Sequence, residues 1–199
     1  MNFIFDLGGV VVTWEPDKLI AQHFTDPVLQ SRVKSQFVGH ADWIELDRGT
    51  LPRQTAIERA AQRIGVTEAE IAGLLNSVPA ALVAMPGTVA MLYRLKAQGH
   101  SLYCLSNMHR EFIDYLEKTY DFWPVFNGVV VSCRVQLCKP EPATFEYILG
   151  KYALDPGATL FIDDMAVNLS AAATLGIQTL QFQNPAQCGA GLKTLGYLD

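Results

Sequence analysis

The sequence predicts an α/β fold, with a Rossmann-like three-layer core built on a parallel sheet and an inserted all-helical segment. Short apolar runs that end in glycine or polar residues recur along the chain, as is typical of buried strands. In the second half of the chain these runs alternate with amphipathic segments, which indicates a parallel sheet covered by helices on both faces. Between Val12 and Ser101 no such run occurs, and the apolar residues follow helical spacing instead.

The first predicted element is a buried strand formed by Phe3-Ile4-Phe5 and ended by Asp6. The pair Gly8-Gly9 follows, and glycines let the backbone turn sharply and pass close to a bound group. Ligands of open α/β sheets bind at the carboxyl ends of the strands. Asp6 is therefore a candidate nucleophile or metal ligand. The alternative is that Asp6 only caps a turn.

The next segment, residues 15–83, is predicted to be an all-helical cap. Residues 67–70, Thr-Glu-Ala-Glu, have the spacing of a capping box. The remaining residues, 1–14 and 84–199, are predicted to form the core domain. The helical periodicity within the cap covers residues 17–24, 27–39, 43–46, 53–64 and 67–78.

From Pro86 onward the sequence predicts helices and strands in turn. The predicted strands are 102–105, 129–131, 159–162 and 177–182, and the predicted helices are 87–97, 109–118, 141–152, 168–175 and a last one within 185–198.

Composition limits the partners and the compartment. The formal net charge is −5 with no basic patch, which argues against nucleic acid as a partner. No apolar stretch approaches the ~18 residues that span a bilayer, and no signal peptide is evident, so no membrane partner is expected. The four cysteines form no CxxC pair, which argues against structural zinc or a disulfide framework and favours a reducing, cytoplasmic setting.

Polar residues follow three further predicted strands: Ser106-Asn107, Lys139-Pro140 and Asp163-Asp164. Because parallel strands end at the same edge of a sheet, these groups are expected to converge with Asp6. Adjacent carboxylates favour a hard cation such as Mg²⁺. The alternatives are a helix-capping Asp beside a solvated one, a surface lysine, and an ordinary Ser-Asn turn.

This set of motifs resembles the haloacid dehalogenase-like (HAD) hydrolase superfamily, in the family's order and over nearly the whole chain. The helical insertion resembles the C1-type cap of subfamily I, and the reading Asp-Leu-Gly at the first motif resembles a branch with sugar-phosphate phosphatases. The resemblance implies the sheet order 5-4-1-2-3 and an aspartyl-phosphate intermediate on Asp6. It also implies phosphoryl contacts from Ser106 and Lys139 with Asn107 nearby. Mg²⁺ would be held by Asp6, the Gly8 carbonyl, Asp164, and Asp163 directly or through water.

One position departs from the pattern. Most phosphatases of the superfamily carry a second Asp, the general acid and base, where this chain has Gly8. The proton must then come from water, the substrate or another residue, and His109, just after the Ser106-Asn107 turn, is one candidate. General acid–base help is typically worth about 10²–10⁴-fold, so its loss slows turnover without abolishing it.

The cap is expected to set specificity for a small phosphorylated metabolite such as a sugar phosphate. Trp14, Trp43, Asp47, Arg48 and His40 are candidates to line the cap–core interface. The alternative for the tryptophans is plain cap core, and for Arg48 a solvated surface position.

The rival functions are a metal-free 2-haloacid dehalogenase and a catalytically weak binding or regulatory protein. Dehalogenases also lack the second Asp, but Asp163-Asp164 favours the phosphatase. We expect a monomer or weak homodimer. The sequence names neither the substrate nor the group that replaces the missing acid.

Overall fold

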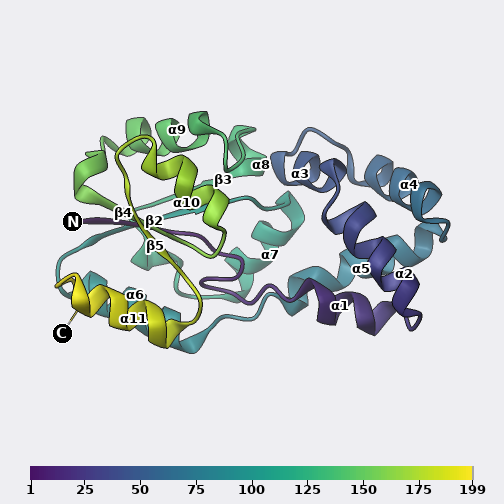
Figure 1. The fold of residues 1–199 in the computed structure, drawn as a ribbon, viewed down its shortest axis with the longest axis horizontal. Helices are drawn as coiled ribbons and strands as arrows, with labels where there is room; N and C mark the ends of the chain where they lie inside the picture. The colour runs from purple at the N-terminus through teal and green to yellow at the C-terminus, as the bar shows by residue number, and fades with distance from the viewer. Residues whose placement is uncertain (199) are drawn as a thin grey trace.

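A computed structural model describes residues 1–198, and its centre is a five-stranded parallel sheet (Figure 1). The strands follow the order β3-β2-β1-β4-β5, which confirms the predicted parallel sheet and its order. Their bounds are β1 (Asn2–Phe5), β2 (Ser101–Ser106), β3 (Gly128–Val131), β4 (Thr159–Asp163) and β5 (Gln178–Gln181).

Strand β1 lies at the centre of the sheet because it has a parallel neighbour on each side. Ile4 pairs with Tyr103 of β2 and with Phe161 of β4. Phe3, Ile4 and Phe5 are completely buried, as the uninterrupted apolar run predicts for a strand covered on both faces.

Helices cover both faces of the sheet and give the predicted three layers (Figure 1). On one face Ile4 and Phe161 pack in an apolar cluster with residues of α9 (Pro142–Tyr152) and α10 (Ala166–Ala173). On the other face, Phe3 and Phe5 belong to a larger cluster. This cluster includes residues of α6 (Pro86–Ala97), α7 (Arg110–Thr119) and α11 (Pro185–Thr194).

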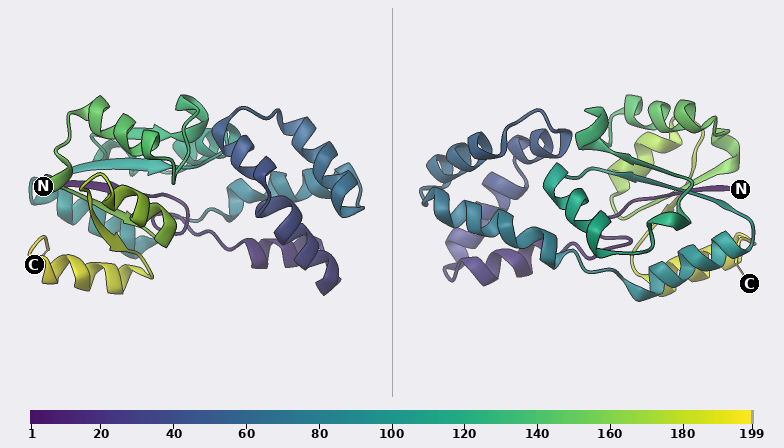
Figure 2. Two further views of the ribbon diagram at one scale, coloured as in Figure 1. Left: turned by 45° about the horizontal axis from the view of Figure 1, so that its top comes forward. Right: turned by 180° about the vertical axis from the view of Figure 1, so that it is seen from behind.

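A helical cap lies at one end of the core in all three views (Figures 1 and 2). No strand occurs among residues 15–83, and the capping box from Thr67 to Glu70 is present. The cap elements are α1 (Pro16–His23), α2 (Pro27–Val33), α3 (Ala41–Arg48), α4 (Arg53–Ile64) and α5 (Glu68–Ala81).

The predicted helix 27–39 differs from the structure. Helix α2 ends at Val33, and the backbone continues as one π-helical turn, η1 (Lys34–Val38). That turn buries Phe37 completely, and its ring packs edge-on against Trp43 at a centroid distance of 5.3 Å. Tertiary packing inside the cap therefore overrides a continuous α-helical pattern.

The chain enters and leaves the cap at one place. Thr13 N donates to Val83 O at 2.8 Å, Val83 N donates to the Thr13 hydroxyl at 3.0 Å, and Met85 N donates to Val11 O at 2.9 Å. The two connections therefore lie side by side. Among residues 1–198, no helix is long and apolar enough to cross a membrane.

Candidate active site

Three carboxylates gather at the carboxyl ends of β1 and β4. Asp6 follows β1, Asp163 ends β4, and Asp164 is the next residue. One carboxylate oxygen from each lies within 4.8 Å of those of the other two. Hard oxygen donors at this spacing are the ligand type that Mg²⁺ takes in proteins.

A buried lysine lies between two of these carboxylates. Lys139 Nζ is 2.9 Å from Asp6 Oδ1 and 2.7 Å from Asp163 Oδ2. Burial acts to lower the pKa of Lys139, but the carboxylates of Asp6 and Asp163 outweigh it and raise that pKa. Lys139 therefore stays charged, and one cation faces three carboxylates.

The excess of negative charge contributes to raised pKa values at two of the three aspartates. Burial raises the pKa of Asp6 to about 7; Lys139 opposes this shift, while Asp163 and Asp164 add to it. Burial and the neighbouring Asp163 also raise the pKa of Asp164. A divalent cation among these oxygens would relieve the repulsion, so the residues present fit such an ion.

Asp163 is held in place by three hydrogen bonds from two residues besides Lys139. Met165 N donates to its Oδ1 at 2.8 Å, and the amide of Asn168 donates to both oxygens at 3.0 and 3.1 Å. Sequence reasoning missed Asn168. The available signal was a buried amide in the first turn of the helix that follows Asp163-Asp164.

Gly9 makes room for the third carboxylate. Its φ is +76°, and a Cβ built there would lie 2.8 Å from Asp164 Oδ2. Gly8 differs, because the nearest atom to a Cβ at that position is Trp14 Cβ at 3.9 Å. The two adjacent glycines therefore have different reasons to be glycine.

Ser106, the last residue of β2, and Asn107, the next residue, differ in their hydrogen bonding. Ser106 Oγ is buried, and none of the described residues hydrogen-bonds it. The Asn107 amide instead pairs with the backbone of Lys139, donating to its O at 2.8 Å and accepting from its N at 2.9 Å. Asn107 thus fixes the segment that carries Lys139.

A chamber of about 360 Å³ lies between the cap and the core. Of the residues that the sequence singled out, its lining contains Asp6, Gly8, Trp14, Trp43, Asp47, Asn107, Lys139 and Asp164. Arg48, His40, His109, Ser106 and Asp163 do not line it.

Asp47 and His109 form a buried pair beside the chamber. His109 Nε2 lies 3.2 Å from Asp47 Oδ1, without the alignment of a hydrogen bond. Burial, aided by Arg53, lowers the pKa of His109 to about 3, while burial and the charge of Asp6 raise that of Asp47 well above its usual range. Both shifts favour the neutral form, of the acid and of the imidazole respectively.

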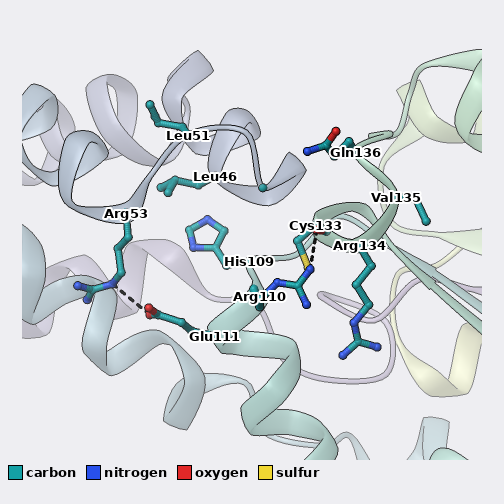
Figure 3. A pocket seen from close by; sticks show the side chains of 11 residues that line it. Leu46, Leu51, Arg53, His109, Arg110, Glu111, Cys133, Arg134, Val135 and Gln136 are labelled. Atoms are coloured by element: carbon teal, nitrogen blue, oxygen red, sulfur yellow. Dashed lines mark hydrogen bonds and ion pairs between the residues drawn. The ribbon is translucent and has the colours of Figure 1, made fainter.

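His109 faces a second cavity of about 510 Å³ instead of the chamber (Figure 3). Its ring stacks on Phe112 at a centroid distance of 4.3 Å. The charged side chains around this cavity are engaged, since Arg53 Nε lies 3.1 Å from Glu111 and Arg110 donates to Cys133 O at 3.0 Å.

Arg48 and His40 have structural contacts. The Arg48 guanidinium binds Glu141 of the core through two bonds of 3.0 and 2.5 Å. His40 caps helix α3, where its Nδ1 accepts from Asp42 N at 3.1 Å.

Comparison with known proteins places this geometry in context. The family model described as haloacid dehalogenase-like hydrolase matches residues 1–176. The sesquiterpene phosphatase astK of Aspergillus oryzae is 25% identical over 174 residues, which are 87% of this chain and 85% of that protein.

Two solved structures share the fold. A HAD family enzyme from Bacteroides thetaiotaomicron, in complex with magnesium and inorganic phosphate, has a TM-score of 0.72 and 24% identity, over 92% of this chain and 93% of that one. The L-2-haloacid dehalogenase of Xanthobacter autotrophicus, with chloropropionic acid covalently bound, has a TM-score of 0.67 and 14% identity, over 97% and 82%.

Proposed function

Because the chain belongs to the haloacid dehalogenase-like hydrolase family, we propose that it is a Mg²⁺-dependent phosphatase of a small phosphorylated metabolite. The observation that carries this proposal is the cluster of three carboxylates, two of which contact one buried lysine. A metal-free dehalogenase has no need for that excess of negative charge, whereas phosphoryl transfer depends on charge neutralisation by a metal.

In this proposal the carboxylate of Asp6 is the nucleophile. Its oxygen attacks phosphorus, the bond from phosphorus to the ester oxygen breaks, and water later hydrolyses the aspartyl-phosphate. Lys139 neutralises the phosphoryl oxygens and Asp6, from which its Nζ is 2.9 Å away. The Ser106 hydroxyl donates to the phosphoryl group, a role supported by its lack of a partner among the described residues.

We assign Mg²⁺ to Asp6, Asp163, Asp164 and the Gly8 carbonyl. The ion would supply the positive charge that lets an anionic phosphate approach an anionic nucleophile. Asn168 would keep Asp163 oriented, since ligating carboxylates are typically fixed by further hydrogen bonds.

The remaining candidates take other roles in this proposal. Trp43 and Gly8 contact the substrate from the chamber wall, and Asn107 positions Lys139. Arg48 fastens the cap to Glu141 and His109 supports Asp47. We take residues 15–83 as the cap and residues 1–14 and 84–199 as the core.

Asp47 is our proposed source of the proton that Gly8 cannot supply. It lines the chamber together with Asp6 and Lys139. Burial and the charge of Asp6 raise its pKa, which favours the protonated state that a general acid needs.

The test is phosphate release from p-nitrophenyl phosphate with Mg²⁺ and with a chelator, beside chloride release from 2-chloropropionate. Phosphate release that requires Mg²⁺ is expected. Asp6→Asn should lower kcat by more than about 10³-fold, because an amide is a poor nucleophile. Asp121→Asn, at an exposed aspartate, is the matched control. Chloride release without metal would instead establish the dehalogenase.

A further inference from the structure

The chamber has a polar end and an apolar end. The polar end contains Asp6, Lys139, Asp164 and the Asn107 amide. Apart from Gly8, Asp47 and Asn168, the rest of the wall is apolar and comes from both cap and core. It includes Trp14, Val38, Trp43, Val78, Leu82 and Phe112.

Aromatic rings form a continuous part of that wall. The Trp14 and Trp43 rings lie 5.7 Å apart between centroids, and the Trp43 and Phe112 rings 6.5 Å apart. Trp43 belongs to the cap helix α3 and Phe112 to the core helix α7, so the rings bridge the two parts. Such rings offer a broad apolar surface to a ligand.

The apolar character continues outward to the rim of the chamber. Ile44, Met165 and Val167 line it while remaining 49%, 53% and 53% exposed. Ile44 projects from α3, and the other two flank the start of α10. Large apolar side chains gathered at the mouth of a cavity typically mark a ligand-binding surface.

The cap offers the chamber no positive charge. The part of the chamber lining that comes from residues 15–83 contains no lysine or arginine, and its one ionisable residue is Asp47. Arg48 is bound to Glu141, and Arg53 to Glu111. A second anionic group on a substrate would be buried there without a partner, which is costly. The hydroxyls of a sugar would likewise find few partners on this side.

We infer that the substrate is the phosphate monoester of an apolar alcohol, with its hydrocarbon part against Trp43 and the rim and its phosphoryl group at Asp6 and Lys139. This inference rests on the proposed phosphatase function. It narrows the substrate to a hydroxyl-poor group and departs from the sugar phosphate expected from the sequence. A volume of about 360 Å³ suits a ligand of modest size.

The test compares n-hexyl phosphate with glucose 6-phosphate in the presence of Mg²⁺. Both are primary esters of six-carbon alcohols, and glucose 6-phosphate differs by its pyranose ring and its hydroxyl groups. We expect kcat/KM to be at least about tenfold higher for n-hexyl phosphate, and to rise about threefold per methylene from butyl to hexyl. Calorimetry with n-hexylphosphonate, which has no ester bond to cleave, should give a negative heat-capacity change of binding.

Two substitutions test whether the rim carries this preference. Ile44→Ser should lower the ratio of kcat/KM for hexyl over glucose phosphate by at least about threefold. Val28→Ser is the matched control, because Val28 is also an exposed apolar residue of the cap but does not line the chamber. The control should leave the ratio unchanged.

The outcomes separate this inference from the proposed function. If glucose 6-phosphate is hydrolysed as well as n-hexyl phosphate, the apolar substrate class is wrong while the phosphatase stands. If Ile44→Ser and Val28→Ser both leave the ratio unchanged, the rim has no role and the inference fails. If neither ester nor p-nitrophenyl phosphate releases phosphate, both the function and the inference are overturned.

Discussion

At the scale of single residues, the adjacent glycines 8 and 9 respond differently to a side chain. Gly9→Ala would place a methyl group against the Asp164 carboxylate at a positive φ, whereas a Cβ at Gly8 meets only an ordinary contact. We expect Gly9→Ala to lower stability by about 1–3 kcal/mol and to weaken Mg²⁺ activation. Gly8→Ala should do neither. Chemical denaturation and Mg²⁺ titration of activity measure both effects, and equal responses would contradict the proposed role of Gly9.

The second prediction concerns Asp47→Asn, which should lower activity without lowering stability at pH 8. Its folded pKa is raised, so its favourable contribution to folding is present below pH 3.8 and is lost as pH rises. Asp47→Asn removes the ionisable carboxyl and with it this loss of stability at higher pH. The variant should therefore be at least as stable as the wild type at pH 8. Its kcat/KM on alkyl phosphates should fall by about 10²-fold or more, with a smaller loss on aryl phosphates. Thermal melts at pH 4 and 8 beside kinetics check this; a less stable variant at pH 8 would refute the neutral-acid assignment.

The third prediction concerns position 8, where an acidic side chain can be introduced to test whether it replaces Asp47 as proton donor. A Cβ at position 8 would meet only an ordinary contact, with Trp14 Cβ at 3.9 Å. Gly8→Asp should therefore restore a proton donor and raise kcat/KM on alkyl phosphates in the Asp47→Asn background. The ratio of kcat/KM for alkyl over aryl phosphates in the single and double variants measures the rescue. A ratio unchanged by Gly8→Asp would mean that leaving-group protonation does not limit the rate.

The sequence was informative about residues that lie next to an apolar run. Asp6, Lys139, Asp163 and Asp164 could be selected because strand ends converge. Contacts across the fold were not predictable, because no local pattern encodes them. The pairing of the Asn107 amide with the Lys139 backbone, 32 residues away, is one such contact.

At the scale of elements, helix α3 is one part of the cap that is fastened to the core. Arg48 binds Glu141, and Ser132 donates its hydroxyl to Asp47 O at 2.5 Å. Ser132 starts α8 (Ser132–Val135), a four-residue helix too short to predict from periodicity. The long strands and helices were predictable because they bury regular apolar patterns; the short helix and the π-turn are set by tertiary contacts.

The ion pair between Arg48 and Glu141 predicts that KM rises when the pair is removed. Arg48→Met keeps the aliphatic stem but removes the ion pair, which is partly exposed and worth about 1 kcal/mol. Because the pair favours the closed cap, we expect KM to rise about fivefold with little change in kcat. Lys18→Met is the control, since within residues 1–198 Lys18 pairs only with Glu15 of the cap. An equal effect of both substitutions would show that the cap–core contact has no special role.

At the scale of the whole molecule, the metal-free protein should become less stable as pH rises. The pKa of Asp6 is raised to about 7 and that of Asp164 is also raised, so their stabilising contribution is lost between about pH 4 and pH 7. Mg²⁺ at about 100 times its Kd adds about 2.7 kcal/mol, or roughly 5–10 °C in Tm for a chain of this size.

The Mg²⁺ shift in Tm should therefore be larger at pH 8 than at pH 5, as differential scanning calorimetry can measure. Asp164→Asn should abolish most of this Tm shift. NaCl at the same ionic strength as the Mg²⁺ salt should not reproduce the shift. A shift independent of pH and of Asp164 would argue against a metal at this cluster.

The central position of β1 has a consequence for the order in which the protein is made. Asn2 is translated well before its partners Ser101 and Thr159. At about 5–20 residues per second, β1 waits roughly 8–30 s for its second neighbour. During that time the residues of helices α1–α5 emerge complete, and their mostly local contacts favour early folding. The nascent chain thus carries an unpaired apolar strand ahead of a helical segment, and the sheet is completed only after β4 and β5 have been synthesised.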